Sequence, residues 1–139
     1  YLMGRKDTRN ARRGLAPAKR LLAAGVTVAA ATNNILNAFT PMGTADLALM
    51  GYLLTAAAHM GTESDVANVL AMLTEHPARM LRLPDYGLHV GARADLVLWE
   101  TEQPAEVVTT MAPRRLVVKA GRLSIQHERS CTEFWRSDG

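Results

Sequence analysis

Apolar residues recur at helical spacing in the first half of the chain. Leu15, Ala18 and Leu22 fall on one face of a short helix predicted over residues 15–24, with a glycine directly after it. The run Val26–Ala31 (VTVAAA) is apolar without polar alternation, as is typical of a parallel strand covered on both faces. The succession of helix, glycine and buried strand predicts an α/β fold.

Three further helices are predicted before residue 83. The pattern over Thr44–Met60 is helical, and its apolar residues nearly encircle the helix, which indicates burial on more than one side. The sequence Thr62–Asp65 resembles a capping box and starts a third helix that runs to about Thr74. Pro77 suits the first position of a short fourth helix that ends near Leu81.

The pattern changes to short β segments in the second half. Strands are predicted at Asp95–Trp99, Leu116–Lys119 and Leu123–Gln126, with Ala120 and Gly121 as the turn of a hairpin. We therefore expect a small sheet after the helices.

Composition fits one soluble globular unit. The 139 residues are 48% hydrophobic and 21% charged, and Asp46 and His59 interrupt the longest apolar stretch, so we expect no membrane span. The single cysteine, Cys131, cannot form an internal disulfide, which favours a cytoplasmic location. Because the chain starts at Tyr1 without a methionine, we expect an interior start.

Basic residues crowd the beginning of the chain, whose formal net charge is +3. A nucleic-acid-binding arm and a solvated loop are the two interpretations of this cluster. We favour the loop and expect no nucleic-acid partner, because no aromatic residue is interleaved for base stacking and Asp7 interrupts the run. The cluster consists of Arg5, Lys6, Arg9, Arg12 and Arg13.

A polar loop follows the predicted strand directly and is the best candidate for a site. It contains Asn33, Asn34 and Asn37, and the carboxyl end of a parallel strand is where ligands bind in such sheets. The alternative is that the asparagines only form turns, since asparagine suits left-handed backbone positions, and that Phe39 only packs.

Several phrases resemble metal-dependent amidohydrolases over about residues 1–125. The stretches Gly87–Leu98 (GLHVGARADLVL) and Val117–Leu123 (VVKAGRL) resemble the passage from the last barrel helix into a small flanking β-domain. Thr32–Ile35 (TNNI) with Pro41–Thr44 (PMGT) resembles the loop after the eighth barrel strand of bacterial cytosine deaminases and N-isopropylammelide-type triazine hydrolases. Residues 4–14 resemble the region after the seventh strand.

The resemblance implies the C-terminal portion of a (β/α)8 barrel plus the C-terminal part of a small β-domain. Residues 1–83 would supply the last strands and helices of an incomplete barrel, residues 84–127 the β-domain, and residues 128–139 a tail. Because a barrel needs eight strands to close, we expect a fragment, a split-gene product or a chain that needs its missing N-terminal barrel portion. Exposed apolar surface would favour association, and a homo-oligomer is one form this could take.

The resemblance also implies chemistry. Such relatives bind one or two divalent ions, zinc or iron, mostly through histidines outside the stretch matched here, and deaminate cytosine-like or other nitrogen heterocycles with a metal-activated water. Asn33 stands at the position of the family's metal-binding aspartate and general base. Asn34 stands where a residue meets the substrate ring, and Phe39 stands where an aromatic side chain covers it.

The substitution at Asn33 opens two hypotheses. An amide is effectively non-basic, so Asn33 cannot act as a general base, and none of the four histidines has metal-ligand spacing to another. The first hypothesis is a hydrolase of non-peptide carbon–nitrogen bonds that this chain alone does not complete. The second is a degenerate, non-catalytic binding or interaction module.

Overall fold

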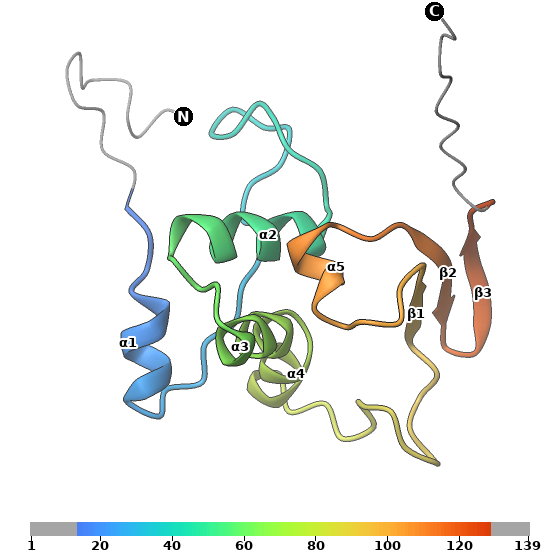
Figure 1. The fold of residues 1–139 in the computed structure, drawn as a ribbon. Helices are drawn as coiled ribbons and strands as arrows, with labels where there is room; N and C mark the ends of the chain where they lie inside the picture. Colours follow the sequence, from blue (N-terminus) through green and yellow to red (C-terminus); the bar gives the residue numbers. More distant parts are fainter. Residues whose placement is uncertain (1–13, 129–139) are drawn as a thin grey trace, which may run out of the picture.

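The structure, a computed structural model, describes residues 14–128 as a group of helices beside a small sheet (Figure 1). The predictions on the basic segment and on most of the tail lie outside these residues and stay predictions. The helices are α1 (Ala18–Ala23), α2 (Leu47–Ala57), α3 (Glu63–Leu73), α4 (Glu75–Met80) and α5 (Glu106–Thr109), and the strands are β1 (Leu96–Trp99), β2 (Arg114–Lys119) and β3 (Arg122–Gln126).

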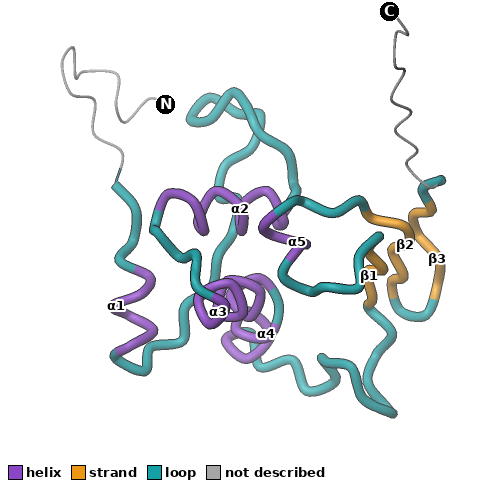
Figure 2. Tube along the Cα trace, in the orientation of Figure 1, coloured by secondary structure: helices purple, strands orange, loops and turns teal. Residues whose placement is uncertain are grey.

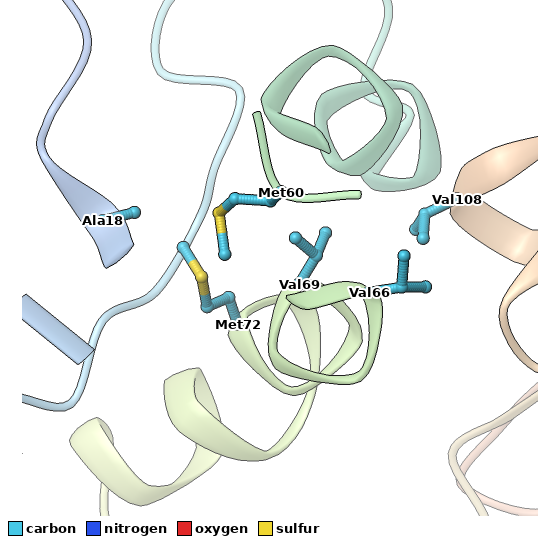
Figure 3. Packing of buried hydrophobic residues seen from close by; sticks show 6 residues of the cluster. All are labelled: Ala18, Met60, Val66, Val69, Met72 and Val108. Atoms are coloured by element: carbon cyan, nitrogen blue, oxygen red, sulfur yellow. The ribbon is translucent and has the colours of Figure 1, made fainter. Parts of the chain in front are cut away.

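The buried core lies among the helices and brings both halves of the described chain together. Figure 3 shows Met60, Val69 and Met72 pointing toward one another, with Val108 of α5 closing the cluster from the side of the sheet. All four side chains are almost completely buried. Burial of apolar side chains of this size is the main stabilising contribution to the helical part.

Helix α3 begins with the capping box that its sequence predicts. The Thr62 hydroxyl accepts the backbone N–H of Asp65, and the Asp65 carboxylate accepts the backbone N–H of Thr62. Asp65 also binds Lys19 of α1 at 2.8 Å, so one buried carboxylate starts α3 and attaches α1 to it.

The predicted strand at Val26–Ala31 is wrong for these residues, because the segment forms no strand (Figure 2). A strand requires a hydrogen-bonded neighbour, and the three strands between residues 14 and 128 all belong to the separate sheet. The segment instead lies against the helices. The Ala30 N–H donates to the Met72 carbonyl at 2.9 Å, and the His76 ring nitrogen Nδ1 lies 2.8 Å from the Val28 carbonyl.

The small sheet is antiparallel with the order β1, β2, β3. Ala120 and Gly121 form the predicted hairpin turn, and both have a positive φ, 48° and 75°, which matches the twist of a two-residue hairpin. The side chain of Asp95 accepts the N–H of Ala120 at 2.8 Å, so the start of β1 holds this turn in place.

One helix begins earlier than predicted, and one helix was not predicted. Helix α4 begins at Glu75, two residues before Pro77, so the proline occupies the third position, which is still within the first turn. Helix α5 is not predicted at all, because its four residues (EVVT) are too few to show a helical period. No helix between residues 14 and 128 is long and apolar enough to cross a membrane.

Candidate functional site

The candidate site is the loop of residues 32–43, which connects the extended segment Val26–Ala31 to α2 and projects beyond that helix (Figure 1). The segment before the loop is fixed on α3 and α4 by the contacts of Ala30 and Val28. The helix after the loop starts with Asp46 as its N-cap, whose carboxylate accepts the N–H of Ala48 at 2.9 Å. Both ends of the loop are therefore anchored on helices.

Asn33 lies at the beginning of the loop in a left-handed backbone conformation, with a φ of 58°. Asparagine adopts this conformation more readily than most residues, so the backbone of Asn33 is of the kind that the turn-forming interpretation expects. Its side chain is exposed, whereas that of Asn34 is half-buried. Within the described chain neither amide makes a hydrogen bond to another residue.

Asn37 makes the local hydrogen bonds that the other two asparagines lack. Its Oδ1 accepts the backbone N–H of Phe39 at 2.9 Å and that of Thr40 at 3.0 Å. This is an Asx turn, and it confirms the turn-forming interpretation for Asn37.

Phe39 does not pack into the core. Its side chain is 56% exposed, and the apolar side chains of Leu36 and Met42 in the same loop are exposed still further. Phe39 is therefore not a core residue among residues 14–128, whereas the alternative that it packs within its own loop stays open. The loop thus carries the amide pair near its beginning and a group of exposed apolar side chains after it.

The loop offers recognition groups but no base. Amides donate and accept hydrogen bonds to the edge of a polar ring, and an exposed aromatic side chain can stack on its face. In the part of the chain that the structure describes, no group of three or more histidine, cysteine, aspartate or glutamate side chains could hold a metal ion. The donors present therefore do not make up a metal site.

The histidines lie apart from one another. His76 contacts the Val28 carbonyl, His89 contacts the carbonyl of its neighbour Val90, and the His59 carbonyl accepts a hydrogen bond from Lys19. His127 lines an open hollow between α2 and the sheet. The contacts of these four histidines therefore go to different parts of the described chain.

Two features near the loop were not found from the sequence. The Arg114 side chain of β2 forms an ion pair with Asp46 and lies over the ring of Trp99, 5.1 Å from its centroid. These three residues line the same hollow as His127. The sequence places Asp46 at the start of a helix, so its role as a cap has a local pattern. Its partner on β2 is distant in sequence, and no periodicity connects the two residues.

Comparison with known proteins gives the architecture a context. The family model described as "Amidohydrolase family" matches residues 1–125. N-isopropylammelide isopropyl amidohydrolase of Pseudomonas sp. (strain ADP) is 31% identical over 113 residues, which are 81% of this chain and 28% of that protein. A 5-methylthioadenosine/S-adenosylhomocysteine deaminase of Desulforudis audaxviator is 40% identical over 119 residues, 81% of this chain and 26% of the relative.

A solved structure shows the same arrangement. The 5-methylcytosine deaminase of Klebsiella pneumoniae liganded with 5-fluorocytosine superposes with a TM-score of 0.84 at 28% identity, over 95% of this chain and 32% of that one. The chain thus spans about a quarter to a third of the length of these relatives. The match over residues 1–125 shows that this chain belongs to the amidohydrolase family.

Proposed function

We propose that this chain is part of a hydrolase that acts on a non-peptide carbon–nitrogen bond of a nitrogen heterocycle, such as a cytosine-like or triazine ring. The observation that carries the proposal is the loop of residues 32–43 in a chain of the amidohydrolase family. It holds Asn33, Asn34 and Phe39 at an anchored but open position. Relatives named for the hydrolysis or deamination of such rings support the same class of substrate.

The three residues have different tasks in this proposal. The Asn34 amide donates to and accepts from the edge of the ring, and Phe39 covers its face. Asn33 offers a carbonyl oxygen and an NH₂ group at the entrance of the loop but takes no proton, because an amide is not basic at neutral pH. In this proposal the chain binds and orients the ring, and the group that moves the proton is not one of these three residues.

The metal of the complete enzyme is likewise not assigned to residues 14–128. Members of this family are generally metal-dependent, but the described residues do not assemble a set of ligands. We assign no step of the reaction to a metal held by this chain. A divalent ion, zinc or iron, would need its ligands from the further part of the protein.

Exposed apolar surface supports the proposal that the site is completed by a further part of the barrel. Helix α2 leaves Leu47, Tyr52 and Leu53 more than two-fifths exposed. The sheet leaves apolar side chains exposed on both faces, since Leu98 and Val97 point to opposite sides. The expectation that α2 is buried on more than one side is not met within these residues, and the missing N-terminal barrel portion would cover this surface.

A direct assay tests the proposal. The full-length protein, supplied with zinc or iron(II), is incubated with cytosine, 5-methylcytosine and N-alkylated aminotriazines, and the release of ammonia or alkylamine is measured together with its metal content. We expect release from at least one ring. A protein that neither turns over nor binds any of these rings would overturn the proposal.

The second candidate is a binding module that has lost its chemistry, and the amide at Asn33 favours it. The variant Asn33→Asp separates the two candidates, because aspartate keeps the size of the side chain and tolerates the left-handed backbone. A gain of hydrolysis in an inactive protein would identify a binding module. Loss of an existing activity would show that asparagine belongs to a working site.

A further inference from the structure

The loop of residues 36–42 holds its own shape. The Leu36 N–H donates to the Met42 carbonyl at 3.5 Å, and the Asn37 N–H donates to the Thr40 carbonyl at 3.0 Å. These two bonds join the first residues of the loop to its last ones. They leave the orientation of the residues at its tip to other interactions.

The Asn37 side chain supplies those interactions. With its Oδ1 it accepts the N–H of Phe39 at 2.9 Å and that of Thr40 at 3.0 Å, so it holds the peptide groups on both sides of the Phe39 Cα. The direction in which a side chain leaves the backbone follows from these peptide planes. The amide of Asn37 therefore sets the direction of the Phe39 Cα–Cβ bond, from which the ring projects.

Packing does not replace this hydrogen bonding. The side chains of Phe39, Leu36 and Met42 are 56%, 72% and 59% exposed, so few contacts with the rest of the fold hold them. Asn37 is itself exposed, and its side-chain bonds stay within the turn. Its removal should therefore release the tip of the loop and leave the fold intact.

We propose that Asn37 is a positioning residue that fixes Phe39 over the bound ring. This inference rests on the proposed function, in which Phe39 covers the face of a planar heterocycle. Asn33 and Asn34 keep their amides free of internal partners, whereas Asn37 uses its carbonyl oxygen internally. The three asparagines of the loop thus divide into two that are open to the ligand and one that shapes the loop.

Three substitutions in the full-length protein test the inference. Asn37→Ala removes the acceptor, Asn37→Gln moves it one methylene away from the two N–H groups, and Asn37→Asp keeps an oxygen in the same place. Asn68→Ala, on α3, is the matched control for loss of an asparagine side chain elsewhere. The readouts are kcat and KM for the best heterocyclic substrate, with the urea midpoint as the measure of stability.

We expect Asn37→Ala and Asn37→Gln to raise KM about tenfold with an unchanged urea midpoint, because small misplacements of a binding group have large effects. Asn37→Asp should stay within about threefold of the wild type. Combining Asn37→Ala with Phe39→Ala should add nothing to Phe39→Ala alone, since the asparagine acts through the ring.

The outcomes are separable. An active wild type with an unchanged KM in Asn37→Ala overturns the inference alone, as does a further loss when Asn37→Ala is added to Phe39→Ala. A wild-type protein that neither binds nor turns over a ring overturns the proposed function and this inference together. If Asn37→Ala and Asn37→Asp both lower the urea midpoint, Asn37 has a structural role only, and the inference is overturned.

Discussion

Asp46 and Arg114 connect the start of α2 to the sheet through an ion pair between residues 68 positions apart in sequence. The same carboxylate caps α2 by accepting the Ala48 N–H, and the same guanidinium lies over Trp99. The helix that follows the candidate loop is thereby attached to β1 and β2 at its first turn. The exit of the loop is fixed by this pair.

Replacing Asp46 with alanine should destabilise the protein by about 2 kcal/mol, because it removes an N-cap worth about 1 kcal/mol and a partly exposed ion pair worth up to about 1 kcal/mol. Asp46→Asn keeps an oxygen for the cap and should lose only about half as much. Urea denaturation of the full-length protein measures both. Asp85→Ala is the control, since Asp85 is exposed and its side chain has no partner among the described residues. Equal losses in the two Asp46 variants would contradict a separate contribution of the cap.

Gly51 of α2 should not tolerate a side chain. A Cβ at this position would lie 2.6 Å from Cγ1 of Val108 and 2.9 Å from Cδ1 of Leu73. Gly51→Ala should therefore cost about 1–3 kcal/mol through overpacking, although alanine is the better helix former. Gly61→Ala is the matched control, because a Cβ there meets nothing within 4 Å. A Gly51→Ala protein as stable as the wild type would show that α5 can move away from α2.

The stability of the hairpin should depend on pH through Asp95. The pKa of this carboxyl is lowered below its ordinary value of 3.8, first by its hydrogen bond with Lys119. The hydrogen bond from the Ala120 N–H and the positive charge of Arg93 lower it further. A lowered folded-state pKa stabilises the fold at every pH above the unfolded-state pKa of about 4, and this contribution is lost as the pH falls through the folded-state value.

Asp95→Asn removes that titration. The wild type should be more stable than Asp95→Asn at pH 7, and the difference should shrink steadily below about pH 4. Thermal unfolding between pH 7 and pH 2.5 measures it, with Asp85→Asn as the control for a carboxylate without a side-chain partner. A difference that stays constant over this range would contradict the assignment.

Local patterns were sufficient for the long helices and the sheet. The residues that start α3, Thr62 and Asp65, contact each other, so their signal is complete within four positions. The strand at Val26–Ala31 could not be decided in this way, because an apolar run becomes a strand only beside another strand. The neighbour that this segment would need does not lie within residues 14–128, and Ala30 pairs with Met72 of α3 instead.

In the candidate loop, too, features set by local sequence could be predicted and features that depend on distant residues could not. Its place before α2 and the left-handed backbone of Asn33 could be predicted, because both follow from residue type and order. The Asx turn of Asn37 was one of two open interpretations until the positions of the Phe39 and Thr40 N–H groups were known. The ion pair of Asp46 with Arg114 could not be predicted, since it depends on how the sheet packs beside α2.

Phe39 should affect binding of the ring without contributing to stability. Because its side chain is more than half exposed, Phe39→Leu should change the free energy of unfolding by no more than about 0.5 kcal/mol. Loss of an aromatic face above a planar ring should raise KM about tenfold, since stacking of this kind contributes about 1 kcal/mol or more. Phe39→Tyr is the matched control, because it keeps the aromatic face and should retain the wild-type KM. Steady-state kinetics and urea denaturation of the full-length protein check the two expectations together. A Phe39→Leu protein with unchanged KM would remove Phe39 from the site, whereas one with a lowered urea midpoint would show that the ring packs against a further part of the protein.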